Sequence, residues 1–91
     1  MTYSVLYHPK VKKFVDKLDK IQKERLRKDI EELQENPFPK GCMKIEGNIL
    51  GFEKEKILRV RVWDYRILYF TTPEDMTINV VRIDKRGRVY E

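Results

Sequence analysis

The spacing of apolar and polar residues changes along the chain, and the changes mark a strand, a helical region and a β-rich region. Residues 3–7 are β-prone and apolar at alternate positions, which predicts a short strand. From Pro9 the apolar residues recur at helical spacing, and Pro9 suits a first helical position because its missing N–H has no partner to lose there. The buried stripe of this first helix would comprise Val11, Phe14, Val15 and Leu18.

A second helix is predicted over residues 21–35. Asn36 and Pro37 end it, because a residue that precedes proline disfavours the helical conformation. Residues 40–56 have little periodicity and contain glycines at positions 41, 47 and 51, so we expect a loop with at most one short strand. The inner face of the second helix would comprise Leu26, Ile30 and Leu33.

From residue 57 the period becomes two, as in a strand with one buried face. A tight turn at Trp63 and Asp64 would make a hairpin that pairs Val62 with Tyr65, Arg61 with Arg66 and Arg59 with Leu68. That register places three arginines on one face and turns Val60, Val62 and Ile67 toward the helices, whereas a slip of one residue would scatter them. Residues 72–75 predict a turn, and residues 76–83 the last strand.

These elements predict one domain over residues 1–91, because no linker, internal repeat or low-complexity tract interrupts the chain. The expected fold is α+β. It has an N-terminal strand, a two-helix hairpin and a twisted, mostly antiparallel sheet. Both helices would cover one face of the sheet, and the opposite face would be basic.

Composition narrows the class of protein. The single cysteine, Cys42, cannot form an intramolecular disulfide and fits a reducing compartment. No apolar run approaches the roughly 20 residues that span a bilayer, so we expect a cytoplasmic protein with no membrane partner. A net charge of +5 favours a polyanionic partner, although the excess charge is spread along the chain.

The positions of the arginines are more informative than the net charge. Six of the eight arginines lie in the last 35 residues, whereas 11 of the 12 lysines lie in the first 56. Arginine presents a planar fork of five donors that suits phosphate, so this segregation predicts a phosphate-binding sheet and a nucleic-acid partner. A solvated sheet face with no ligand would give a similar alternation.

The sequence lacks the common catalytic motifs. The chain has no paired-carboxylate motif, metal-ligand cluster, glycine-rich phosphate loop or Ser/His/Asp set, so we expect neither a metal nor a cofactor. The only histidine, His8, precedes Pro9 and is read as a helix cap or surface residue; Cys42 is read as a small, partly buried apolar residue. Trp63 and Tyr65 are read as packing residues. Arginines and the terminal Tyr90 remain, and they can bind, orient and stabilise charge.

The pattern resembles the RelE/ParE toxin superfamily, and within it the RelE branch of ribosome-dependent messenger-RNA endonucleases. The resemblance runs nearly end to end and includes the first strand, the helical pair and the Asn36-Pro37 stop. Its most characteristic segment is residues 58–69, and Lys85-Arg86 followed by Val89-Tyr90 completes it.

The resemblance implies a toxin of a type II toxin-antitoxin system that cleaves mRNA in the ribosomal A site. In this reaction a ribose 2′-OH attacks the adjacent phosphate and gives a 2′,3′-cyclic phosphate, so the substrate must be RNA and no metal is needed. It also implies a RelB-like antitoxin as partner, besides the 70S ribosome and mRNA.

The resemblance also assigns roles to residues. Arg59 and Arg61 match the paired basic positions that face the scissile phosphate, and Arg66 matches a phosphate-clamping arginine. Arg86 matches the arginine near the leaving 5′-oxygen, and Tyr90 matches a tyrosine that orients a base. Among the remaining basic residues, the expected RNA contacts are Lys85, Arg82 and Arg88.

One departure from the family affects the mechanism. The best-described bacterial relatives have lysines at the paired basic positions, one of them the proposed general base, whereas this chain has Arg59 and Arg61. Arginine is a poor base because its pKa lies above ~12. Two other functions stay open: inhibition of DNA gyrase, as in ParE-like members that share the fold, and noncatalytic binding of RNA or the ribosome.

Overall fold

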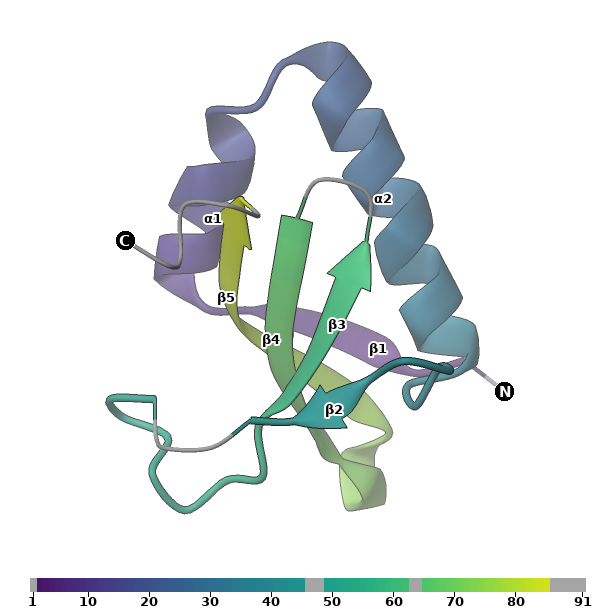
Figure 1. The fold of residues 1–91 in the computed structure, drawn as a ribbon, viewed down its shortest axis with the longest axis vertical. Coiled ribbons are helices and arrows are strands. Elements are labelled where there is room, and N and C mark those ends of the chain that lie inside the picture. Colours follow the sequence, from purple (N-terminus) through teal and green to yellow (C-terminus); the bar gives the residue numbers. More distant parts are fainter. Residues whose placement is uncertain (1, 46–48, 63–64, 86–91) are drawn as a thin grey trace.

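A computed structural model describes residues 2–45, 49–62 and 65–85 of the chain. Two helices lie on one face of a five-stranded sheet (Figure 1). The strand order is β1-β5-β4-β3-β2; β1 is parallel to β5, and the other neighbours are antiparallel. In chain order the elements are β1 (Ser4–Tyr7), α1 (Pro9–Asp16), α2 (Lys20–Glu35), β2 (Met43–Lys44), β3 (Leu58–Val62), β4 (Tyr65–Thr72), a 3-10 turn (Pro73–Asp75) and β5 (Thr77–Lys85).

Both helices begin where their capping residues require. His8 is the N-cap of α1, and its Nδ1 accepts a hydrogen bond from the Lys10 backbone N–H at 3.4 Å, which confirms its reading as a cap. Asp19 and Gln22 form a reciprocal capping box, so α2 begins at Lys20, one residue before the predicted start. No helix in the described ranges is long and apolar enough to cross a membrane.

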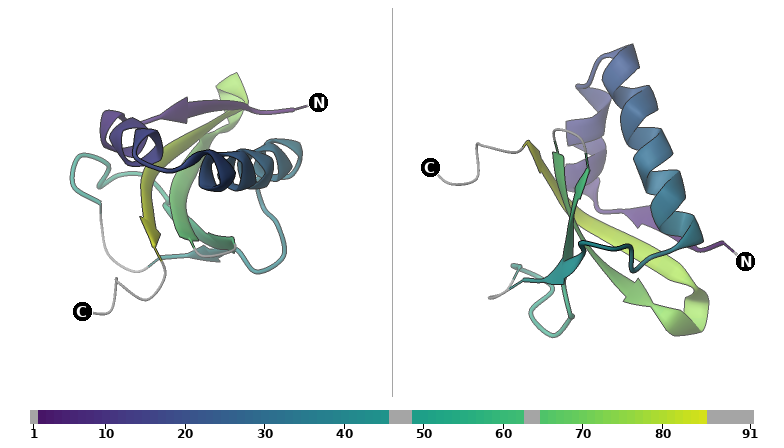
Figure 2. Two further views of the ribbon diagram at one scale, coloured as in Figure 1. Left: turned by 90° about the horizontal axis from the view of Figure 1, so that it is seen from above. Right: turned by 45° about the vertical axis from the view of Figure 1, so that its right-hand side comes forward.

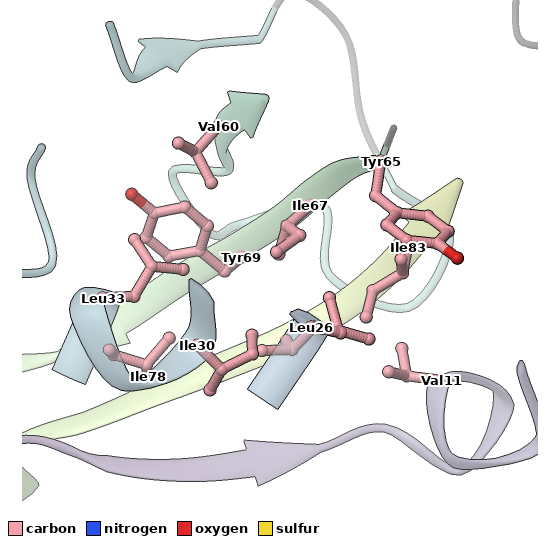
Figure 3. Packing of buried hydrophobic residues seen from close by; sticks show 11 residues of the cluster. Val11, Leu26, Ile30, Leu33, Val60, Tyr65, Ile67, Tyr69, Ile78 and Ile83 are labelled. Carbon is pink, nitrogen blue, oxygen red and sulfur yellow. The ribbon is translucent and has the colours of Figure 1, made fainter. Parts of the chain in front are cut away.

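The main core lies between the helices and the sheet (Figure 3). The three α2 residues predicted to face inward are all buried, as is Val11 of α1. From the sheet, Tyr65 and Tyr69 contribute fully buried rings, which confirms the reading of Tyr65 as a packing residue. The sheet residues that complete this cluster are Val60, Ile67, Ile78, Val80 and Ile83.

The predicted β3–β4 register is confirmed, with Val62 opposite Tyr65, Arg61 opposite Arg66 and Arg59 opposite Leu68. The predicted turn residues, Trp63 and Asp64, lie outside the described residues. Pairing of β4 with β5 contains a β-bulge that the sequence did not reveal. Leu68 pairs with Arg82 and Tyr69 with Val80, so Val81 is an extra residue in β5.

The prediction that the other face of the sheet is basic is only partly correct. At one end of that face, Ile57, Leu68, Phe70 and Val81 form a second apolar cluster, against which Ile45, Ile49 and Phe52 pack. The right-hand view in Figure 2 shows the segment that carries these residues on the side of the sheet opposite the helices. Because Ile45, Ile49 and Phe52 cover this apolar cluster, the arginines occupy only the other end of this face.

Candidate functional site

Arginines gather on the face of the sheet opposite the helices, in two rows that run across β3, β4 and β5. Arg59, Leu68 and Arg82 form one row, and Arg61, Arg66 and Asp84 form the next. Directly paired residues of antiparallel strands share a face, so four guanidinium groups and one carboxylate face the same side. We call Arg59, Arg61, Arg66 and Arg82 the arginine face.

Asp84 links two members of the arginine face. Its Oδ2 lies 2.9 Å from Arg82 Nε and 3.6 Å from Arg66 Nη2. The side chains of Asp84 and Arg66 are only 22% and 19% exposed, whereas that of Arg82 is 55% exposed. One carboxylate thus holds a half-buried guanidinium in place and leaves an excess of positive charge on this face.

Arg59 and Arg66 have unused donors. The Nε groups of both are buried, and neither has a hydrogen-bond partner among the described residues. A buried donor of this kind carries a desolvation cost until an acceptor arrives. Among the described residues, the Arg59 guanidinium donates from Nη2 to Met43 Sδ at 2.9 Å, a soft and weak acceptor. A guanidinium suits an oxyanion, which would reach these two buried Nε groups once the side chains rearrange.

The β-bulge creates this grouping. With a continuous register, Arg82 would lie opposite Ile67 and would point into the core beneath the helices. The extra residue Val81 reverses the alternation, so that Arg82 and Asp84 face outward with Arg66.

The structure brings together four of the predicted site residues, those of the arginine face. Lys85 is not among them, because it pairs with Tyr65 and therefore lies on the helix side of the sheet, beside Phe14 and Leu18. Arg86, Arg88 and Tyr90 lie outside the described residues.

Asp84 is a functional candidate that sequence reasoning missed. Its spacing of two residues from Arg82 was a usable signal, since residues i and i+2 of a strand share a face. Its contact with Arg66 depends on the bulge and could not be read from the chain. Within residues 2–45, 49–62 and 65–85, no group of three or more His, Cys, Asp or Glu residues is placed to hold a metal ion.

Fold and site together define a small basic α+β protein whose sheet presents arginines opposite its helices. Comparison with protein families agrees with this class. Residues 5–90 match the family described as the ParE toxin of the type II toxin-antitoxin system parDE. A search of curated proteins gave no match.

Solved structures of RelE toxins are also similar to this chain. The archaeal RelE of a RelE-RelB complex from Pyrococcus horikoshii is 31% identical, with a TM-score of 0.75 over 97% of this chain and 99% of that one. Isolated Escherichia coli RelE is 23% identical, with a TM-score of 0.70 over 97% of this chain and 90% of its own. A chain of the toxin-antitoxin complex RelBE2 of Mycobacterium tuberculosis is 20% identical, with a TM-score of 0.75 over 94% of this chain and 100% of that one. The chain belongs to the RelE/ParE superfamily of type II toxin-antitoxin toxins.

Proposed function

We propose that this toxin is a ribosome-dependent endoribonuclease that cleaves mRNA in the A site. The observation that carries the proposal is the direct pairing of Arg61 with Arg66, beside Arg59 and the Asp84-held Arg82. Like charges placed directly opposite each other in a sheet are unfavourable, and an anionic ligand bound between them would reduce this cost. RNA phosphate is that ligand.

Catalysis on this face rests on orientation and charge. The 2′-oxygen of one ribose bonds to the adjacent phosphorus, the bond from phosphorus to the 5′-oxygen breaks, and the products are a 2′,3′-cyclic phosphate and a 5′-hydroxyl. The proton lost by the 2′-hydroxyl is balanced by the proton gained at the 5′-oxygen. Arg61 and Arg66 neutralise the phosphorane, because their donors meet charge that develops in the transition state.

Proton removal is assigned to water, the ribosome or the substrate. Arginine is a poor general base, so the roles proposed for Arg59 and Arg61 are binding and charge stabilisation. Arg86 is the proposed charge stabiliser at the leaving oxygen, and Tyr90 the proposed base-orienting residue. Both roles rest on family resemblance.

The test is a defined translation reaction with purified toxin, in which mRNA breaks and their end groups are mapped. We expect breaks only in ribosome-occupied codons, with 2′,3′-cyclic phosphate ends. Arg86→Ala should lower cleavage by about 10²-fold, the scale of losing one oriented charge donor, and should keep the wild-type melting temperature.

Arg27→Ala is the matched control. Arg27 lies on α2, on the helix side of the molecule, and pairs there with Glu24 and Glu31. Its loss removes one positive charge without touching the arginine face, so cleavage should not change. Intact mRNA in the wild-type reaction, or an equal loss of activity with Arg27→Ala, would overturn the proposal.

A second function is inhibition of DNA gyrase, which the family match to ParE toxins favours. In that case the arginine face would dock on a protein or on DNA without cleaving a bond. A supercoiling assay with purified gyrase separates the two functions: inhibition of supercoiling with intact mRNA would select the ParE-like function.

We further propose a RelB-like antitoxin as the natural partner. Two similar structures, from P. horikoshii and M. tuberculosis, are toxin-antitoxin complexes. An acidic segment of such a partner would cover the arginine face and block RNA. A purified complex in which Arg61 stays exposed and cleavage continues would contradict this arrangement.

A further inference from the structure

A hollow of about 480 Å³ lies beside the arginine face, where α1, the segment 49–52 and β5 meet. Its volume falls in the range of small-molecule sites, about 300–1,000 Å³. Two of the residues that line it, Arg82 and Asp84, also belong to the rows described above. It therefore opens directly from the proposed phosphate site.

The floor of the hollow is an open strand edge. β1 pairs with β5 only from Thr77 to Val80. After β1, the N–H of His8 donates to the Val80 carbonyl at 3.0 Å, and the chain then turns away from β5 into α1. Residues 82–84 of β5 pair with β4 on one side, Val81 is the bulge residue, and in the described part of the chain no strand covers the other side of residues 81–84. An edge of this kind presents backbone donors and acceptors.

Aromatic rings and cations form the walls. The His8 and Phe52 rings meet edge to face, with centroids 5.4 Å apart, and the Phe52 and Phe70 ring centroids lie 5.6 Å apart in a tilted arrangement. Lys10 and Arg82 contribute positive charge. Leu50 also lines the hollow, with 90% of its surface exposed.

We propose that this hollow is a subsite for one unpaired base of single-stranded RNA and for its phosphate, next to the nucleotide bound on the arginine face. The base lies against Phe52 and His8, its edge reaches the open backbone of residues 81–84, and Arg82 with Lys10 binds its phosphate. This subsite rests on the proposed function and extends it, because it fixes where the strand leaves the arginine face.

The chemistry of the walls favours RNA over a peptide strand. Single-stranded RNA is recognised by stacking on aromatic rings together with cationic contacts to the backbone, and the hollow offers both within one small volume. A duplex does not fit, since its bases are stacked and unavailable. A segment of the antitoxin, added as a strand to the open edge, is the competing occupant.

The experiment combines two variants with a modified RNA series. The probe is a short single-stranded RNA with 2′-O-methyl groups, which cannot be cleaved, and an abasic site is moved along it one position at a time. His8→Asn removes the ring and keeps a side chain that caps α1 well, and Phe52→Leu removes the flat ring and keeps apolar volume against Phe70. Phe38→Leu, at an aromatic residue that is 54% exposed, is the control.

For the wild type, we expect one abasic position to weaken binding by about fivefold or more, the effect of losing one base–aromatic stack. With Phe52→Leu or His8→Asn, RNA without an abasic site should bind more weakly, and the loss at that position should disappear, as in a double-mutant cycle. Phe38→Leu should behave as the wild type.

Two results separate this subsite from the proposed function. If RNA binding needs Arg61 and Arg66 but no abasic position couples to His8 or Phe52, the subsite is wrong and the function stands. If binding is unaffected when Arg61 and Arg66 are replaced, both fail. Antitoxin protection of backbone amides at residues 81–84, with no RNA coupling there, would assign the edge to a peptide strand.

Discussion

Arg61 of β3 and Arg66 of β4 are direct cross-strand partners, so two positive side chains lie opposite each other on one face of the sheet. Asp84 lies 3.6 Å from the Arg66 guanidinium, and Arg61 is the more exposed of the two arginines. A pair of like charges in this position costs stability. An anion bound between the two arginines would reduce this cost, so the pair favours anion binding and lowers the stability of the unbound protein.

Replacing Arg61 should separate stability from activity. Arg61→Thr keeps a β-branched residue in the strand and removes the repulsion with Arg66, so the free energy of unfolding should stay within about 0.5 kcal/mol of wild type or rise. Cleavage of mRNA should fall by about 10²-fold. Denaturant unfolding and the translation assay measure the two effects; a large loss of stability would identify Arg61 as a structural residue.

Asp84 should act as a positioning residue. Asp84→Asn removes the charge that holds Arg66, so unfolding should become easier by about 1–3 kcal/mol. RNA should still bind, as tightly or more tightly, because the face becomes more positive. We therefore expect a lower kcat with an unchanged or lower KM.

A double-mutant cycle checks the link between Asp84 and Arg66. If Asp84 acts by holding Arg66, the stability cost of Asp84→Asn should shrink when Arg66 is already replaced by methionine. Additive costs for the two substitutions would show that Asp84 acts through other contacts.

Tyr69 should stabilise the fold without taking part in catalysis. Its ring is fully buried on the helix side, and its hydroxyl donates to the Pro37 carbonyl at 2.7 Å. Tyr69→Phe leaves that carbonyl without its donor and should cost about 1–2 kcal/mol of unfolding free energy. Cleavage at a temperature where both proteins are folded should be equal, and a slower variant would contradict this assignment.

Alkaline pH offers a second test of Tyr69. Burial, with a smaller effect of the neighbouring Cys42, raises the pKa of the folded Tyr69 far above its ordinary value of 10.0. Below that ordinary value its contribution to stability is constant; above it, only the unfolded chain loses the proton. The free energy of unfolding should then fall by up to about 1.4 kcal/mol per pH unit from this residue.

Comparison with Tyr69→Phe isolates this effect. The stability difference between wild type and the variant should narrow as pH rises from about 9 to 11, because the variant has no proton to lose at this position. Parallel stability curves would show that Tyr69 ionises normally in the folded protein.

Leu26 and Arg27 are sequence neighbours with opposite expected behaviour. Leu26 is only 3% exposed and lies in the main core, so Leu26→Ala should cost about 2–5 kcal/mol. Arg27 is exposed and forms surface ion pairs, so Arg27→Ala should change stability by less than about 1 kcal/mol. Thermal unfolding of the two variants side by side measures the contrast.

The fold was predictable where a local pattern determined it. Pro9 and Asn36-Pro37 mark one helix start and one helix end by backbone chemistry alone, and the alternation around Arg59 and Arg61 gave the hairpin register. By contrast, the segment after Cys42 has no period, so its role as a cover for Leu68 and Phe70 was invisible. That role depends on contacts between residues distant in the chain.

The site was predictable only in part for the same reason. Arg59, Arg61 and Arg66 share a face through the hairpin, which is local. Arg82 and Asp84 join them through pairing between β4 and β5, and the sequence of β5 alone does not show where that ladder skips a residue.

Val81 is that skipped residue, and the bulge accommodates it without changing which of the following residues face the core. Deleting Val81 would remove the bulge but would still place Arg82 opposite Leu68, Ile83 opposite Ile67 and Asp84 opposite Arg66. Loss of one residue here would therefore leave the arginine face in place and would cost the second apolar cluster one of its members. When relatives are aligned through β5, a one-residue gap at Val81 therefore marks the absence of the bulge and leaves the surface and interior positions at the end of the strand unchanged.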